Sequence, residues 1–206
     1  MNAADLQREL EAANLEAARA AVGCVPLHAA SIDTPAGVIA LAGQSHAGKS
    51  TLVAAAVLAG YGYVADEITA VSPSDLSVRP FHRPIGLRRG GASAVGVDYP
   101  DTPDGRYDIV YPWDVDEGLP RSPGGTLTGI VLVGWGRDAE VALTDVDKAR
   151  ALVELSQHTV IPDDQLAPAF GGLERLVRAV PIARMTYRTT AESLDLLARL
   201  VERWTP

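Results

Sequence analysis

The stretch Ala40–Val53, ALAGQSHAGKSTLV, holds two glycines five residues apart, followed at once by a lysine and a serine. The apolar run GVIALAG before this turn predicts a strand, and KSTLVAAAVLAG after it predicts a buried helix. A strand, a glycine-rich turn and a helix are the context that the phosphate-binding pattern G-x-x-x-x-G-K-[ST] requires. We therefore favour a phosphate-binding loop over an ordinary turn. The pattern is matched by Gly43, Gly48, Lys49 and Ser50.

The residue types in this loop suit a nucleotide triphosphate. Glycines let the backbone wrap around an anion with its N–H groups pointing inward, and the helix N-terminus adds a positive end. Lys49 is expected to reach the β- and γ-phosphates, and the Ser50 hydroxyl to contact Mg²⁺. His46 is read as a solvent-facing side chain, with a contact to the nucleotide as the alternative. The residues expected to bind ATP are Gly43, Gln44, Ser45, His46, Ala47, Gly48, Lys49, Ser50 and Thr51.

Two acidic residues follow in the next predicted strand, YGYVADEITA. Phosphoryl transfer needs groups that hold the metal and direct the γ-phosphoryl group. A strand, loop, helix and second strand would place Asp66 and Glu67 beside the phosphates. Neighbouring residues on a strand point to opposite faces, so only one of them faces the site unless the strand bends, and we expect it to be Asp66. The alternative is that both are solvated charges at a strand end.

The remaining periodicity predicts a three-layer α/β fold with a mixed sheet, because hairpin patterns and strand-helix-strand patterns coexist. We expect one domain over residues 1–206, with an N-terminal helix at about residues 3–21 and a helix over PDDQLAPAFGGLERLVRAV that breaks near Gly171 and Gly172. The Pro- and Gly-rich segment from Arg83 to Gly125 predicts functional loops. Further strands are expected in CVPLHAASID, LSVRPFH, TLTGIVLVGWG, VALTDV and PIARMTYR, and further helices in DKARALVELSQHT and TTAESLDLLARLVERW.

Composition limits the classes of function. The formal net charge is -8, and no stretch gathers lysine and arginine with aromatic residues, so we expect no nucleic-acid partner. Cys24 is the single cysteine, which leaves no disulfide framework or cysteine metal cluster. No signal-peptide pattern and no run of about 20 apolar residues is present, so we expect no membrane partner and a cytoplasmic location.

A resemblance to a known family rests on three segments in order: H-A-A-S from His28 to Ser31, GQSHAGKST, and V-A-D-E. By itself, His28 in an apolar strand indicates a hydrogen-bonded core or edge residue. Together the segments resemble the catalytic domain of HPr kinase/phosphorylase, which has a histidine-containing strand, a glycine-rich ATP loop and a V-A-D-D segment. RPFHRPIGLRRG and VPIARMTYRTTAESLDLL look like the short stand-alone relatives found with lasso-peptide biosynthesis proteins.

The resemblance implies the fold shared by HPr kinase and phosphoenolpyruvate carboxykinase, a P-loop in a mixed sheet flanked by helices. It implies catalytic roles for Lys49, Asp66 and His28, with Asp66 as a metal ligand or as the base for the acceptor hydroxyl. Ser50, Asp66 and Glu67 are the implied metal ligands, although Glu67 stands where the family has aspartate. The E-I-R-G-L-G signature and the large N-terminal domain are missing, so neither the phosphorylase reaction nor the family's hexamer is implied.

The expected function is an ATP- and Mg²⁺-dependent kinase that transfers the γ-phosphoryl group to a hydroxyl, serine being preferred, of a peptide or protein. A small-molecule kinase and a non-catalytic nucleotide-dependent binding module are the alternatives, and a homo-oligomer is kept open. The arginines that we consider for gripping the transferred phosphate or the substrate are Arg83, Arg88, Arg89 and Arg106.

Overall fold

Strand β3 (Gly37–Ala42), which leads into the glycine-rich loop, lies inside a mixed β-sheet. The computed structural model describes residues 3–99, 109, 119–159 and 166–206. The other strands in these ranges are β1 (Val25–Leu27), β2 (Ala29–Thr34), β4 (Gly62–Ala65), β5 (Thr69–Val71), β6 (Ser77–Arg79), β7 (Gly125–Trp135), β8 (Ala142–Asp145) and β9 (Ile182–Tyr187). Their order is β1-β5-β6-β7-β3-β2-β4, and β9 pairs with both β7 and β8. Since β3, β7 and β9 are parallel and their neighbours antiparallel, the predicted mixed sheet is confirmed.

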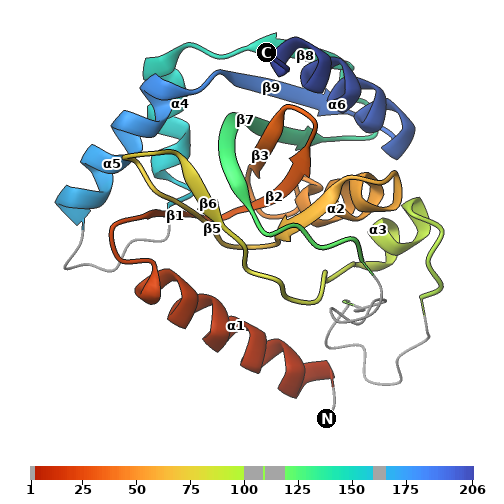
Figure 1. The fold of residues 1–206 in the computed structure, drawn as a ribbon. Helices are drawn as coiled ribbons and strands as arrows, with labels where there is room; N and C mark the ends of the chain where they lie inside the picture. The colour runs from red at the N-terminus through yellow and green to blue at the C-terminus, as the bar shows by residue number, and fades with distance from the viewer. Residues whose placement is uncertain (1–2, 100–108, 110–118, 160–165) are drawn as a thin grey trace.

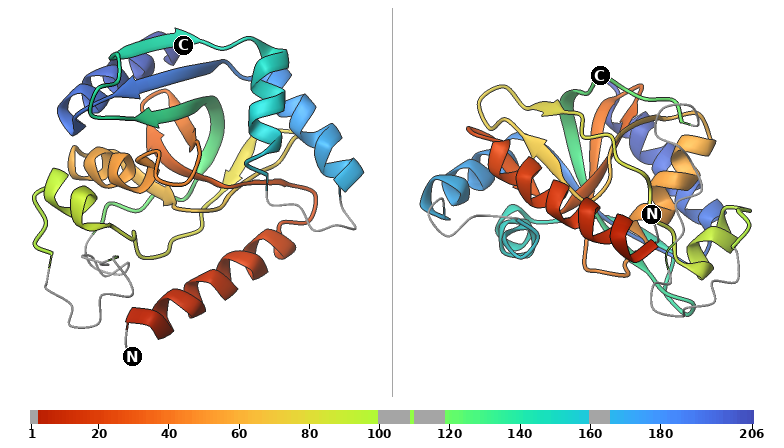
Figure 2. Two further views of the ribbon diagram at one scale, coloured as in Figure 1. Left: turned by 180° about the vertical axis from the view of Figure 1, so that it is seen from behind. Right: turned by 90° about the horizontal axis from the view of Figure 1, so that it is seen from below.

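Helices cover the two faces of this sheet (Figures 1 and 2). Ile39 and Leu41 of β3 pack in one core cluster with α2 (Lys49–Leu58) and α6 (Thr190–Trp204). Val38 and Ala40 pack in a second cluster with α4 (Lys148–Ser156) and α5 (Leu166–Ala179). This alternation is what a strand buried on both faces requires. The α/β class with helices on both sides is therefore confirmed. The other helices in the described ranges are α1 (Ala3–Ala20) and α3 (Arg89–Ala94).

Two strand runs that the sequence predicts as continuous are interrupted side by side. β1 and β2 are separated at His28, and β4 and β5 are separated at residues 66–68. Because β1 pairs with β5 and β2 pairs with β4, the two interruptions face each other in the sheet. Glu67 has a φ of 79°, which is rare for a residue with a side chain. The chain therefore bends at the acidic pair, which is the condition under which both acids can approach one site.

Two predictions about regular structure are wrong. α5 runs through Gly171 and Gly172 without a break. A Cβ on Gly172 would lie 2.7 Å from Val25 Cγ2, so this glycine lets the helix pack closely on β1 rather than ending it. Helix α3 forms within the segment that was predicted to be all loop, and residues 100–108 and 110–118 of that segment lie outside the described residues.

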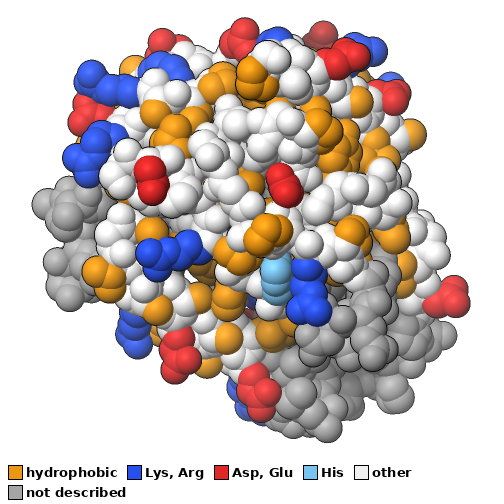
Figure 3. Space-filling model, in the orientation of Figure 1, with side chains coloured by type: hydrophobic (Ala, Val, Ile, Leu, Met, Phe, Trp, Pro, Cys, Tyr) orange, Lys and Arg blue, Asp and Glu red, His pale blue; other side chains and the backbone are white. Residues whose placement is uncertain are grey.

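The N-terminal helix is confirmed as α1, which lies outside the layered sheet and helices in Figure 1. No helix among the described residues is long and apolar enough to cross a bilayer. On the face shown in Figure 3, acidic and basic side chains of the described residues are interspersed with hydrophobic ones. Surface charge on this face therefore points to no single site, and the extent of the domain, 1–206, stays a prediction.

Candidate functional site

The predicted phosphate-binding loop joins β3 to α2 in the structure. Gly48 precedes α2 with a φ of 93°, in the left-handed region that favours glycine. A Cβ at Gly48 would lie 2.5 Å from the Tyr187 hydroxyl oxygen, and one at Gly43 would lie 2.7 Å from the Val133 carbonyl oxygen. Both glycines of the pattern are therefore required by packing against β7 and β9, in addition to any role at a phosphate.

Lys49 is folded back across the loop. Its Nζ donates hydrogen bonds to the carbonyl oxygens of Gly43, at 2.9 Å, and Gln44, at 3.1 Å. Burial lowers the pKa of Lys49, while the charges of Glu67 and Asp66 oppose that shift. The two carbonyl oxygens hold the Lys49 ammonium group inside the glycine-rich loop. A positive charge is therefore present at the place where an anion such as phosphate would bind.

The other loop residues differ in exposure. Gln44, Ser45 and His46 are exposed, and His46 has a φ of 69°. The exposed side chain of His46 agrees with its reading as a solvent-facing loop residue. Gly43 and Lys49 are buried, and Ala47, Gly48, Ser50 and Thr51 are partly buried.

Asp66 lies next to the start of α2. The residue is 1% exposed, and its Oδ1 accepts a hydrogen bond from Ser50 Oγ at 3.1 Å. Burial, followed by the charge of Glu67, raises the pKa of Asp66 to about 6, against opposing effects of Arg83, Ser50 and Lys49. A carboxylate poised in this range can exchange a proton near neutral pH.

Ser50 Oγ and Asp66 Oδ1 are hydrogen-bonded at a spacing that a shared magnesium ion could also adopt. Two adjacent ligands of an octahedral Mg²⁺, each at about 2.1 Å, stand about 3 Å apart. The Oγ to Oδ1 distance of 3.1 Å matches that spacing. No group of three or more His, Cys, Asp or Glu side chains in the described ranges could hold a metal by itself. An ion here would consequently need phosphate oxygens and water as further ligands, which is how Mg²⁺ usually binds with nucleotides.

His28 and Glu67 meet at the interruption of the two strand runs. His28 Nδ1 lies 3.4 Å from Glu67 Oε2, and both side chains are about one third exposed. Burial and Lys49 lower the pKa of His28, and Glu67 opposes this. The imidazole is therefore mostly neutral at pH 7. The His28 backbone N–H donates to the His158 carbonyl oxygen at 2.5 Å, which ties this interruption to the end of α4.

One of the four candidate arginines lies by the acids. Arg83 is 6% exposed, and its Nη1 donates to Asn14 Oδ1 at 3.0 Å. Its Nε is buried without a hydrogen-bond partner among the described residues, and its charge lowers the pKa of Asp66. Arg88 and Arg89 are exposed at the start of α3, and Arg106 lies outside the described residues.

A pocket of about 490 Å³ opens on the other side of the loop. It sits at the carboxyl ends of the parallel strands β3 and β7, where α/β sheets usually bind ligands. The structure adds Trp135, Glu154, His158 and Arg184 to the site, none of which was a sequence candidate. The pocket is lined by residues 43–47, residues 132–135, Glu154, Gln157, His158 and Arg184.

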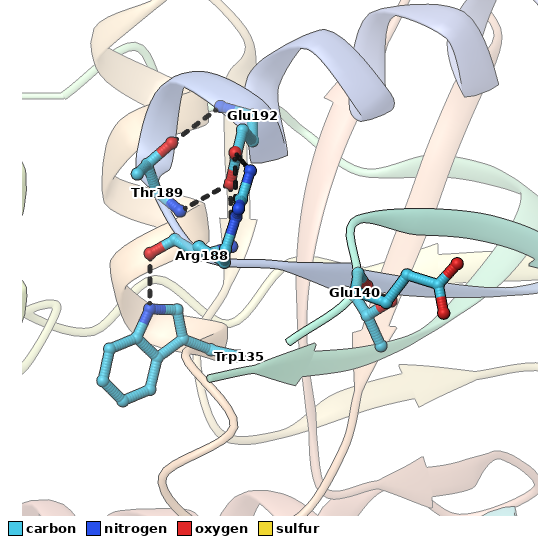
Figure 4. A network of polar contacts seen from close by, with 6 residues as sticks. Trp135, Glu140, Arg188, Thr189 and Glu192 are labelled. Atoms are coloured by element: carbon cyan, nitrogen blue, oxygen red, sulfur yellow. Dashed lines mark hydrogen bonds and ion pairs between the residues drawn. The ribbon is translucent and has the colours of Figure 1, made fainter. Parts of the chain in front are cut away.

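Two side chains that line this pocket, Arg184 and Trp135, are held in place by different contacts. Arg184 Nη2 lies 2.7 and 2.6 Å from the two carboxylate oxygens of Glu154, and the hydrogen bond from Arg184 is the main reason that the pKa of Glu154 is lowered. Trp135 is 48% exposed, and its indole Nε1 donates to the Arg188 carbonyl oxygen at 2.9 Å (Figure 4). The pocket thus has a paired cation on one side and a fixed aromatic ring on another.

Comparison with solved structures finds proteins of similar structure at low sequence identity. The structure of the Hpr(Ser) kinase/phosphatase from Coxiella burnetii aligns with 86% of this chain and 93% of that chain, at a TM-score of 0.38 and 11% sequence identity. No protein-family model and no curated protein sequence matches this chain.

Proposed function

We propose that this protein is an ATP-dependent kinase that transfers the γ-phosphoryl group to a hydroxyl of a peptide or protein. The observation that carries the proposal is the contact between Ser50 Oγ and Asp66 Oδ1 beside Lys49 in the loop. A loop for phosphates, a pair of oxygens for a metal and a buried carboxylate are the parts that phosphoryl transfer needs. The sequence resemblance to HPr kinase supports the same proposal, including its P-loop fold.

Each residue has a proposed task. The loop N–H groups and Lys49 bind the β- and γ-phosphates and hold the γ-phosphorus in line with the acceptor. Ser50 and Asp66 would hold Mg²⁺, with Glu67 as a further carboxylate. When bound, the ion neutralises charge that develops on the phosphate oxygens. His28 acts by positioning Glu67, which lies 3.4 Å from it.

Where Asp66 acts as the base instead of as a metal ligand, the proton of the acceptor hydroxyl is proposed to move to it. A pKa of about 6 leaves this carboxylate mostly ionised at pH 7 yet more basic than an exposed one. Arg83, buried beside Asp66, is the proposed partner that offsets charge as the phosphoryl group moves. Its Nε is buried and has no hydrogen-bond partner among the described residues, and a phosphate oxygen is its proposed acceptor.

The preferred acceptor is a serine hydroxyl in a peptide, because RPFHRPIGLRRG and VPIARMTYRTTAESLDLL resemble the relatives found with lasso-peptide proteins. The test is to incubate the protein with Mg²⁺ and γ-labelled ATP, together with serine-containing peptides that include those encoded by neighbouring genes. Mass spectrometry should find label on a peptide hydroxyl, with ADP as the second product. Label on a metabolite but on no peptide would favour the small-molecule kinase. Binding of ATP without transfer to any acceptor would favour the binding module.

A further inference from the structure

Trp135 is an exposed aromatic ring that is held rigidly beside the loop. Its indole N–H is fixed on the Arg188 carbonyl, and Figure 4 shows the six-membered ring projecting away from that contact at the end of β7. A Cβ on Gly48 would lie 3.3 Å from Trp135 Cβ, so the tryptophan stands next to the start of α2. About half of this large residue is exposed to water, at 48%. A ligand that covered the ring would bury this apolar surface favourably.

The pocket runs from Trp135, at the end of β7, to His158, whose carbonyl oxygen accepts a hydrogen bond from the His28 N–H, so only its Trp135 end is remote from the acidic pair in strand order. β2, which begins directly after His28, and β4, which ends directly before Asp66, are on one flank of β3, and β7 and β9 are on the other. The pocket contacts residues 43–47 of the loop but not Ser50 or Asp66. If the transferred phosphate lies beside Asp66, the rest of the nucleotide follows the loop away from Asp66. The nucleoside then leaves the loop on the side of Trp135.

We infer that the pocket beside Trp135 takes the nucleoside of the bound nucleotide, with the indole ring stacked on the base. This inference rests on the proposed function, because it assumes that the triphosphate occupies the loop. The volume of about 490 Å³ is within the range of small-ligand sites. Stacking on a flat ring tolerates any base, so Trp135 contributes affinity, and purines, which have the larger ring system, gain more from it than pyrimidines.

The opposite wall of the pocket is suited to the polar part of a nucleoside. Both oxygens of Glu154 are within 2.7 Å of Arg184 Nη2, and Arg150 Nε donates to Oε1 at 3.1 Å. The carboxylate is thereby engaged, and the Arg184 guanidinium is held in place at the pocket wall. A fixed guanidinium offers N–H donors to ribose or phosphate oxygens without further ordering.

The test compares two ligands by titration calorimetry with Mg²⁺ present: ATP, and tripolyphosphate, which has no base. In Trp135→Ala the Kd for ATP should rise about 10- to 100-fold, and the Kd for tripolyphosphate should stay within about twofold. Trp135→Phe should retain most of the ATP affinity because it keeps a ring. Phe170→Ala is the matched control, since Phe170 is 49% exposed on α5 and is not among the pocket-lining residues.

Three results would overturn the inference. The first is unchanged ATP affinity in Trp135→Ala while the wild-type protein binds both ligands, which would leave the proposed function standing. The second is an equal loss for ATP and tripolyphosphate, which would assign Trp135 to the shape of the loop. The third is a loss in Trp135→Phe as large as that in Trp135→Ala. If the wild-type protein binds neither ligand, the proposed function fails with the inference. Thermal melting of each variant identifies any that do not fold.

Discussion

The two flanks of β3 are built differently. Toward β2 and β4 the strands are antiparallel and interrupted at His28 and residues 66–68, and a carboxylate is buried at the interruption. Toward β7 and β9 the strands are parallel and continuous, and the pocket presents Trp135 and a paired Arg184 to solvent. The first flank concentrates titratable groups, whereas the second offers shape and a rigid ring.

This difference indicates that the flank of β2 and β4 is the less stable of the two. An interrupted strand loses ladder hydrogen bonds, and burying Asp66 disfavours its ionised form, as its raised pKa shows. The contacts on the pocket flank are ordinary ones, namely a capped helix, a paired arginine and a parallel ladder. We therefore expect changes on the acidic flank to alter turnover strongly, and changes on the pocket flank to alter affinity or stability.

The largest expected effect is that of Asp66→Asn on turnover. Asparagine keeps the size and can still accept from Ser50, but it cannot take a proton and is a weaker metal ligand. Loss of a general base lowers rates by about 10²- to 10⁴-fold. The comparison of kcat with the Kd for ATP checks this, since affinity should change far less. Turnover within a few-fold of the wild type would remove Asp66 from the chemistry and break the contrast between the flanks.

Lys49→Ala is expected to have the next largest effect. Removing one pre-positioned charge from a developing anion costs about 10²- to 10³-fold in kcat. The affinity for both ATP and tripolyphosphate should also fall, unlike in Trp135→Ala, because Lys49 is proposed to bind the phosphates. The matched control is Lys148→Ala, which removes the chain's other lysine at the carbonyl of Val180. Equal kinetic losses in the two lysine variants would count against the loop.

Asp66→Asn should also stabilise the ligand-free protein in a pH-dependent way. Folding raises the pKa of Asp66 from 3.8 to about 6, so ionisation costs stability progressively as pH rises between about 4 and 6, and the cost is complete above that range. Relative to the wild type, the variant should be of similar stability near pH 4 and about 1 to 3 kcal/mol more stable above pH 7.

Urea unfolding in the presence of a chelator measures this difference across the pH range. A stability difference that does not change with pH would show that Asp66 has an ordinary pKa in the folded protein. The acidic flank would then not differ from the pocket flank in its stability.

The loop could be predicted from sequence because its residues are contiguous and its strand and helix are adjacent. Asp66 followed from the path of the chain. The bend at Glu67 could not be predicted, since a φ of 79° leaves no mark on an apolar run such as YGYVADEITA. The supposed break in α5 failed for a similar reason: Gly172 serves a contact with Val25, which is distant in sequence.

The pocket was missed because its walls meet only in the folded chain. The lining residues 43–47, 132–135, Glu154 and Arg184 come from four separate parts of the chain. Trp135 and Arg184 likewise come from β7 and β9, whose place beside β3 is decided by strand order. The apolar run TLTGIVLVGWG and the glycines that flank it predict a central strand. They do not predict which other strands lie beside it in the sheet. A local pattern therefore indicates the glycine-rich loop between β3 and α2, and only tertiary structure indicates what surrounds it.

The smallest expected effect concerns the start of α6, next to the contact that holds Trp135. Thr189 Oγ1 accepts from the Glu192 backbone N–H at 3.2 Å, and Glu192 Oε2 accepts from the Thr189 N–H at 3.0 Å, a capping box (Figure 4). Thr189→Ala should cost about 1 kcal/mol, seen as a Tm lower by about 2 to 4 °C, and Thr189→Ser should cost much less. The Kd for ATP should stay within about twofold, because the carbonyl that holds Trp135 belongs to Arg188 and survives the change. A loss of ATP affinity like that of Trp135→Ala, with tripolyphosphate unaffected, would show instead that the helix cap positions the ring.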